Sequence, residues 1–210
     1  MKIIRLALSL LAVLTLSTLP LVAQATEGAP TPISVAAISD WLNKLETAKA
    51  RITQINPDGT ISTGKLYIRR PGRMRFEYDP PNAALVIAGG GSVAIFDYKS
   101  NEPPQQYPLK RTPLSVILAK DVDLTRDKMI TGQSFDGTAT TIRAQDPKNP
   151  EIGYIDLVFT DNPIELRQWV ITDQDGNKTT VILGDLKTGI PLADSLFSVE
   201  LELQKNAPDR

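Results

Sequence analysis

The side chains that could do chemistry in this chain are carboxylates, lysines, arginines and tyrosines, because its 210 residues include neither histidine nor cysteine. Nucleophiles that depend on a histidine base are therefore excluded, as are the usual zinc sites. Catalysis by carboxylates, lysine or tyrosine alone remains open, but no group of these residues has a recognisable catalytic spacing. The sequence therefore predicts a protein that is not an enzyme and that uses no cofactor.

Three segments resemble ligand-binding motifs, and each has a simpler interpretation. Asp121, Asp123 and Asp127 could contact Ca²⁺, but the glycine turn and the terminal glutamate of a calcium loop are missing, so we predict a solvated acidic loop. The Asp-Gly pair within 173–177 is typical of a hairpin turn. The glycines 89–91 are not followed by Lys-Ser/Thr and open no helix, so a loop between two strands is expected rather than a phosphate site.

One cation has a position that needs an explanation. Two alternating strands meet at Pro71-Gly72, and alternation places Arg70 on the same face as Leu66 and Ile68. A buried and unpaired charge is costly. Arg70 could keep its head in water at the rim of a barrel, or it could reach across the mouth and bond the backbone carbonyls of a covering helix.

The apolar residues of these and the following strands also allow two interpretations. They can fill a closed core, which composition alone favours, or line a cavity for an apolar ligand. The residues predicted to line such a cavity are Leu66, Ile68, Met74, Phe76, Tyr78, Leu85, Ile87 and Ile95.

Two short helices are expected to cover one face of these strands. Each is predicted to begin at a Thr-Pro pair, Thr31-Pro32 and Thr112-Pro113, with threonine as N-cap and proline in the first turn. Each carries a narrow apolar stripe. The stripe residues are Ile38, Trp41, Leu42 and Leu45 in the first helix, and Leu114, Ile117 and Leu118 in the second.

The remainder reads as about eleven short strands separated by turn signals, which is typical of an antiparallel sandwich or barrel. The fold class is therefore mainly β with a few short α-helices. No linker divides residues 26–210, so a single domain is expected. Lysine and arginine (23) nearly balance aspartate and glutamate (24), which gives no indication of a nucleic-acid partner.

Residues 1–25 have the pattern of a cleaved secretory signal peptide. Lys2 and Arg5 precede an apolar stretch over 6–22, and Ala23-Gln24-Ala25 forms a small-residue cleavage site before Thr26. The alternative is an uncleaved membrane anchor. The cleavage site favours removal of residues 1–25. Together with the near-neutral charge and the lack of a second apolar span, it leads us to expect a periplasmic monomer.

Several segments, in this order, resemble the periplasmic outer-membrane lipoprotein carrier family (LolA-type). They are Ala50-Arg51-Ile52-Thr53-Gln54, Gly64-x-Leu66-x-x-x-Arg70-Pro71, Arg75-Phe76-Glu77-Tyr78-Asp79-Pro80 and Thr112-Pro113-Leu114. The resemblance is strongest over 50–119. Ile52 stands where the family often has an aromatic residue, and the charged tail after Leu203 shows little sign of the extra strand of some members.

This resemblance implies an incomplete, unclosed antiparallel β-barrel whose helices form a lid over an apolar cavity. It implies that Arg70 is the lid latch. It also implies three partners: acylated lipoproteins, an inner-membrane lipoprotein-releasing ABC transporter and an outer-membrane acceptor. A binding module for another amphiphile, or a sensor that binds a regulatory partner on the same scaffold, is the alternative function.

Overall fold

The structure is a computed structural model that describes residues 30–205 except 83, 101 and 127, so the predicted signal peptide lies outside the described residues. Its strands are β1 (Thr47–Ile55), β2 (Ile61–Arg69), β3 (Arg73–Tyr78), β4 (Ala84–Gly89), β5 (Ser92–Asp97), β6 (Gln105–Pro108), β7 (Ile130–Phe135), β8 (Ala139–Ala144), β9 (Tyr154–Thr160), β10 (Glu165–Thr172), β11 (Lys178–Leu183) and β12 (Lys187–Thr188). The α-helices are α1 (Val35–Lys44), α2 (Leu114–Leu118) and α3 (Val199–Lys205), and the 3₁₀ helices are η1 (Leu109–Arg111), η2 (Pro150–Ile152) and η3 (Asp194–Phe197).

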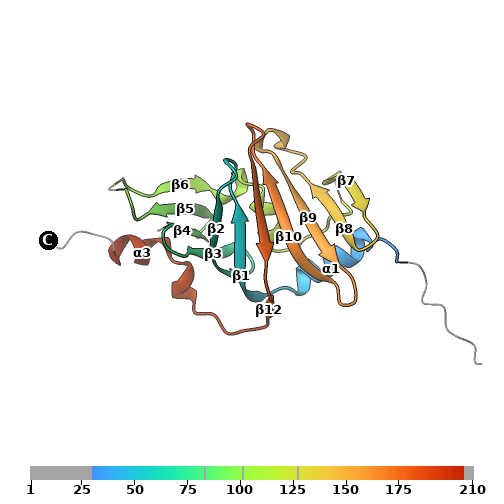
Figure 1. Ribbon diagram of the computed structural model, residues 1–210, viewed down its shortest axis with the longest axis horizontal. Helices are drawn as coiled ribbons and strands as arrows, with labels where there is room; N and C mark the ends of the chain where they lie inside the picture. Colours follow the sequence, from blue (N-terminus) through green and yellow to red (C-terminus); the bar gives the residue numbers. More distant parts are fainter. Residues whose placement is uncertain (1–29, 83, 101, 127, 206–210) are drawn as a thin grey trace, which may run out of the picture.

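All strands belong to one antiparallel sheet with the order β6-β5-β4-β3-β2-β1-β11-β10-β9-β8-β7, and β12 also pairs with β1 (Figure 1). The sheet curves but does not close, because β6 and β7 remain its two edges. The predicted unclosed antiparallel barrel of about eleven strands is therefore confirmed, with β12 as an additional two-residue strand.

Both edge strands have features that disfavour pairing with an additional strand. β6 has only four residues, all exposed, and ends at Pro108, which has no N–H to donate. β7 has a register irregularity between Ile130 and Gly132 where it pairs with β8. Short, proline-containing or bulged strands offer poor templates for an additional strand.

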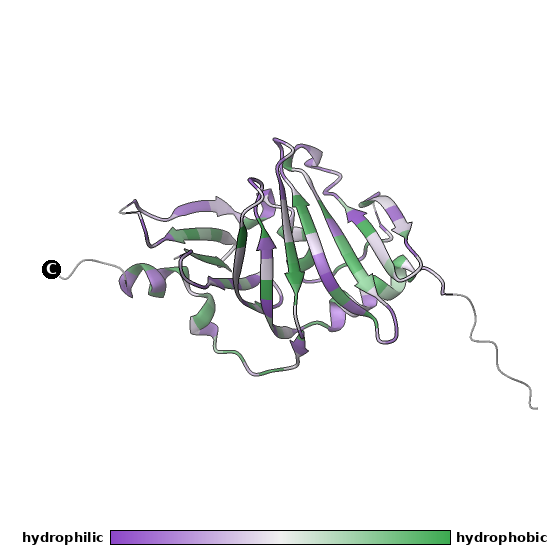
Figure 2. Ribbon diagram, viewed as in Figure 1, coloured by the Kyte–Doolittle hydropathy of each residue, from purple (hydrophilic) through white to green (hydrophobic). Residues whose placement is uncertain are grey.

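The β2–β3 hairpin has the register that the alternation predicts. Leu66 pairs with Phe76 and Ile68 with Met74, so these four side chains share one face of the sheet. Gly72 in the connecting turn has φ +72°, which glycine adopts without strain. We call this face the inner face. Along several strands, polar and apolar residues alternate, so the two faces of the sheet differ in polarity (Figure 2).

The prediction for β4 is wrong, because Leu85 and Ile87 lie on the opposite, outer face. Leu85 pairs with Glu77 and Ile87 with Arg75, whereas Val86 is the residue that faces Phe76. Residues 84–89 are small or apolar at every position, so alternation alone could not tell which side is buried inward.

Ile95 does lie on the inner face, since it pairs with Val86, but it is 36% exposed near the β6 edge.

The helix starts also differ from the prediction. Helix α1 begins at Val35, and the Ser34 hydroxyl caps it by accepting the N–H of Ala37 at 3.1 Å. The preceding Ile33 is buried, and its N–H donates to the hydroxyl of Thr140 on β8, which holds this segment against the sheet instead of in the helix. Helix α2 begins after Pro113 without a side-chain cap.

Candidate functional site

The inner face is one continuous apolar surface that extends over most of the sheet. Of the predicted lining residues, Leu66, Ile68, Met74 and Phe76 are at most 5% exposed, and Tyr78 is half-buried at the margin. The strands on the other side of β1 extend this surface with Trp169, Phe159, Ile142, Ile155 and Leu157, which are fully buried. Sequence reasoning did not include this second half.

Helix α1 covers this surface with the predicted stripe. Ile38 and Leu42 are fully buried and Leu45 is 5% exposed, all in the same cluster as the inner-face residues. Trp41 is only partly buried, and its ring meets Phe159 edge-on with 5.3 Å between centroids. An amphipathic helix therefore seals the sheet at this end without any polar contact through its stripe.

Helix α2 covers the same face beside α1. Leu114, Ile117 and Leu118 are 9%, 4% and 2% exposed and belong to the inner-face cluster. The chain then continues inward, because Val122 and Leu124 are buried in that cluster too. We call α1 together with residues 114–124 the lid.

Arg70 joins the sheet to the lid. Its Nη2 donates a hydrogen bond of 2.7 Å to the carbonyl oxygen of Ala119, directly after α2. Two backbone bonds of 2.8 Å reinforce this corner: the N–H of Gly72 donates to Leu118, and the N–H of Arg70 donates to Glu46. Arg70 thus contacts the lid carbonyl as the second of its two sequence-based interpretations requires.

The environment of Arg70 is unfavourable for its charge. Partial burial lowers the pKa of the guanidinium, and the carboxylate of Asp121 acts in the opposite direction through space. The Nε atom is buried and has no hydrogen-bond partner among the described residues. A buried donor without a partner costs free energy, so the unpaired Nε–H of Arg70 offsets part of the stabilisation that its bond to Ala119 gives the closed lid.

A second set of contacts holds the two parts of the lid together. The side-chain amide of Asn43 on α1 donates to the carbonyl of Val122 at 2.8 Å and accepts its N–H at 2.9 Å. The Ser39 hydroxyl accepts the N–H of Leu124 at 3.0 Å. Sequence reasoning missed these bonds, because they join segments about eighty residues apart. They connect α1 to residues 122–124, so the two parts of the lid are bonded to each other.

The outer face has its own helical cover, which the sequence did not predict. Leu85, Ile87, Ala94 and Phe96 form a small apolar cluster there, with Val199 of α3 packed against it. Gly89 permits η3 to approach, since a Cβ at this position would lie 2.1 Å from the carbonyl oxygen of Phe197.

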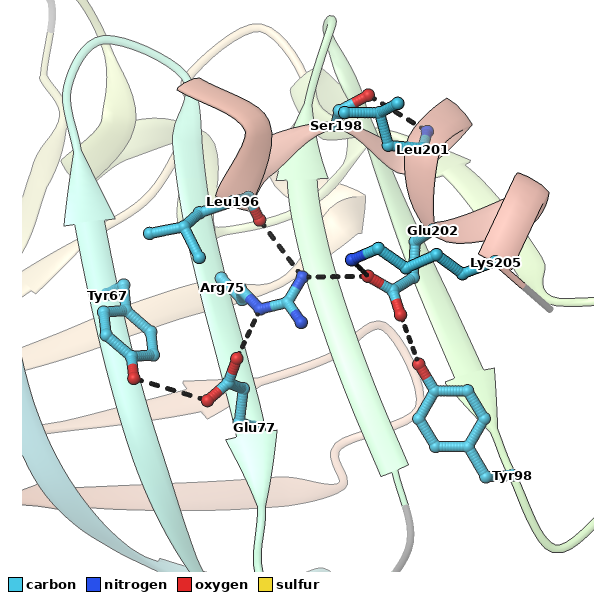
Figure 3. A network of polar contacts seen from close by, with 9 residues as sticks. All are labelled: Tyr67, Arg75, Glu77, Tyr98, Leu196, Ser198, Leu201, Glu202 and Lys205. Carbon is cyan, nitrogen blue, oxygen red and sulfur yellow. Dashed lines mark hydrogen bonds and ion pairs between the residues drawn. The ribbon is translucent and has the colours of Figure 1, made fainter. Parts of the chain in front are cut away.

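A network of charges ties α3 to the strands (Figure 3). Arg75 on β3 donates to Glu77, to the carbonyl of Leu196 and to Glu202, with its side chain only 11% exposed. The hydroxyl of Tyr98 donates to the other oxygen of Glu202 at 2.9 Å. Burial would raise the pKa of Glu202, but Tyr98, Arg75 and Lys205 outweigh it and lower the pKa.

The described residues contain neither a cluster of metal ligands nor a helix suited to span a membrane. Outside the masked positions, no three potential ligand side chains are grouped so that they could hold a metal ion. Asp123 instead accepts the N–H of Thr125 and pairs with Arg126. None of the helices in the described part of the chain is long and apolar enough to cross a membrane.

This geometry defines a class of protein: an open antiparallel β-barrel in which helices cover an apolar sheet face and a single arginine bonds the cover. Comparison with known proteins agrees. The family described as "Outer membrane lipoprotein carrier protein LolA" matches residues 43–200. The chain therefore belongs to the LolA family.

Individual relatives are distant but extend over most of the chain. A protein of Pseudomonas syringae pv. syringae named outer-membrane lipoprotein carrier protein is 24% identical over 211 residues, covering 96% of both chains. One of the same name from Coxiella burnetii is 25% identical over 169 residues, covering 76% of this chain and 79% of its own. The solved structure of a LolA superfamily protein from Nitrosomonas europaea covers 80% of this chain and 99% of its own, with 10% identity and a TM-score of 0.43.

Proposed function

We propose that this protein is a periplasmic, non-enzymatic carrier that binds the acyl chains of lipoproteins on the inner face and delivers them to the outer membrane. Residues 1–25 would direct it to the periplasm and be removed there. The proposed partners are acylated lipoproteins, an inner-membrane ABC transporter that releases them and an outer-membrane acceptor. The related proteins named outer-membrane lipoprotein carrier protein support this function.

The observation that carries the proposal is the bond from half-buried Arg70 to the Ala119 carbonyl above the apolar inner face. This contact is one hydrogen bond to a backbone carbonyl, which water can replace when the lid leaves the sheet. Lid side chains occupy the inner face in this structure. Acyl chains would take their place when the lid moves away.

The energetics require such a cover. Burial of an acyl chain contributes about 0.8 kcal/mol per CH₂, so lipoproteins with two or three chains do not cross water unaided. A carrier must therefore offer an apolar surface and still release its cargo. Closure of the empty lid competes with the ligand and lowers its affinity, which permits release.

A reconstituted transfer assay tests the role of Arg70. Membranes that contain the transporter would load wild type, Arg70→Leu and Arg51→Leu, and transfer to an outer-membrane acceptor would follow. Arg51→Leu is the matched control, because Arg51 is exposed and pairs with Asp79 on the outer face. Loss of one or two charge-assisted bonds shifts closure by about tenfold to a hundredfold, so Arg70→Leu should load well and transfer poorly.

Two results would contradict the proposal. Equal transfer by Arg70→Leu and wild type would remove the latch role of Arg70. Native mass spectrometry of protein purified from its own periplasm gives the second result: a bound glycolipid or phospholipid, with no lipoprotein in any preparation, would favour a carrier of another amphiphile.

A further inference from the structure

A pocket of about 600 Å³ lies beside the Arg70–Ala119 bond. Four segments meet there: the end of α1 with the start of β1, the β2–β3 turn, the residue that follows Ala119, and the chain after β12. Its lining includes four cations, Arg69, Arg70, Arg73 and Lys120, and one carboxylate, Glu46. The chain as a whole is nearly neutral, with 23 lysines and arginines against 24 aspartates and glutamates, so four cations to one carboxylate is a local excess.

Two of these cations already hold an anion, and two do not. Arg69 and Arg73 both pair with Asp194, whose side chain is 72% exposed. Arg70 and Lys120 form no ion pair with any residue the structure describes, although Asp121 attracts Arg70 through space. The carboxylate of Asp194 therefore neutralises part of the charge of Arg69 and Arg73. Arg70 and Lys120 remain in the pocket without an ion-pair partner among the described residues.

Arg70 has donors left for such an anion. Its one side-chain hydrogen bond, to Ala119, uses Nη2, and Nη1 has no partner among the described residues, whereas Nε is unpaired but buried. A guanidinium offers five donors in a planar fork that matches the oxygens of carboxylates and phosphates. Cations from several directions suit a phosphate better than a carboxylate, because its oxygens point in tetrahedral directions and not in one plane.

We propose that this pocket binds a phosphate group, either free or in the headgroup of a membrane phospholipid, and that the bound phosphate competes with Ala119 for the donors of Arg70. Phosphate binding would then favour the open lid. The binding site stands independently, whereas its effect on the lid rests on the proposed function. A carrier with this site would open where phospholipid headgroups are dense.

Inorganic phosphate is the first probe, observed through the Nε–H resonance of Arg70 by NMR. We expect millimolar phosphate to shift this resonance in wild type, while chloride at the same ionic strength does not. Lys120→Gln and Arg73→Gln should each weaken phosphate binding about tenfold, the usual effect of losing one charge-assisted hydrogen bond. Lys178→Gln is the control, because Lys178 is exposed on β11, where that strand pairs with β10 and away from the pocket.

Vesicle flotation distinguishes the two sources of phosphate. Binding to phosphatidylglycerol vesicles that Lys120→Gln weakens and Lys178→Gln leaves unchanged would assign the site to headgroups. Binding of free phosphate alone would keep the site and assign it to a soluble phosphate. A phosphate effect equal to that of chloride, together with no binding to vesicles, would overturn the proposal. Binding of an acidic peptide only would overturn it in favour of a protein-docking site.

The effect on the lid is measured separately. The chain has no cysteine, so engineered cysteines at Asp40 on α1 and Lys65 on β2 can carry a pair of spin labels. Phosphate should lengthen the distance between them in wild type but not in Lys120→Gln. If phosphate binds without changing this distance, the competition with Ala119 is wrong. None of these measurements uses a lipoprotein, so their failure is distinct from failure of the transfer assay.

Discussion

The sheet carries two apolar surfaces covered by helices, and the two covers are held in different ways. The lid lies over the large inner face, and its polar ties to the sheet end on its backbone carbonyls, from Arg70 to Ala119 and from the N–H of Gly72 to Leu118. Helix α3 covers the small outer cluster, and its ties are charged side chains, Arg75 and Glu202, each about one-tenth exposed.

Under the proposed function the two covers have different roles, because the lid must leave the sheet to admit a ligand and α3 can remain in place. Hydrogen bonds from a lid to backbone groups can be replaced by water when the lid opens, so opening is reversible at modest cost. Removal of α3 would separate Glu202 from Arg75 and Tyr98 and expose the outer apolar cluster to water, so charge-assisted bonds and apolar burial would be lost together. The area of apolar surface does not decide these proposed roles, because the larger area lies under the lid, which is the cover proposed to move.

The largest expected effect compares one buried isoleucine on each face. Ile68→Ala and Ile87→Ala should each lower the free energy of unfolding by about 3 kcal/mol, since both side chains are at most 2% exposed. Only Ile68→Ala should also reduce loading of lipoprotein. Urea denaturation and the loading assay measure the two quantities. If Ile87→Ala impaired loading as much as Ile68→Ala at equal stability, the two faces would not be separate.

Next in size is the charged tie of the outer cover. Arg75→Met should lower the free energy of unfolding by about 2–3 kcal/mol, because Glu202 would keep a buried charge without its arginine. Lipoprotein transfer by the remaining folded protein should be unchanged. Arg143→Met is the control, since that arginine is more exposed and pairs with Asp156 elsewhere on the sheet. A loss no larger than that of the control would remove the distinction between the covers.

A smaller effect is expected within the lid. Asn43→Ala removes both bonds to Val122 and should weaken closure by about 1–2 kcal/mol, with little change in global stability. Binding of a hydrophobic dye should therefore increase about tenfold. Asn149→Ala is the control, because Asn149 is exposed and bonds Asp146 in a loop far along the chain. Unchanged dye binding in folded Asn43→Ala would show that the two lid segments do not depend on each other.

The smallest effect is a pH dependence of the outer cover. Contacts in the folded state lower the pKa of Glu202 below the ordinary glutamate value of 4.5, so the carboxylate stabilises the fold above that pH. This contribution disappears as the pH falls through the folded pKa. Acid titration monitored by Tyr98 fluorescence should show α3 loosening in wild type, and Glu202→Gln should flatten that transition.

Local patterns predicted which face several of the candidate residues occupy. Alternation in the β2–β3 hairpin gave the inner-face residues Leu66, Ile68, Met74 and Phe76, and helical spacing gave the buried stripe of α1. The same reasoning failed at β4, because a strand that is apolar on both faces does not show which of its residues point to the inner face. A strand between two covered surfaces has that composition by necessity.

Contacts between distant segments were out of reach. The pair Arg75 and Glu202 lies 127 residues apart and Asn43 and Val122 lie 79 apart, so neither leaves a pattern in a single sequence. A signal for α3 did exist: Val199 and Glu202 are three residues apart and share the buried side of the helix. The charged appearance of the tail concealed it, because a charge that pairs with a strand is indistinguishable in sequence from one that faces water.

The open edges of the sheet bear on how safely the protein can be stored at high concentration. A barrel that closed completely would have no edge strands, but it would also have no way to part around cargo. An open sheet can polymerise edge to edge into fibrils. The four-residue β6 that ends at Pro108 and the irregular β7 work against this polymerisation at both edges. The sheet thereby stays open while both of its edges disfavour the addition of another strand.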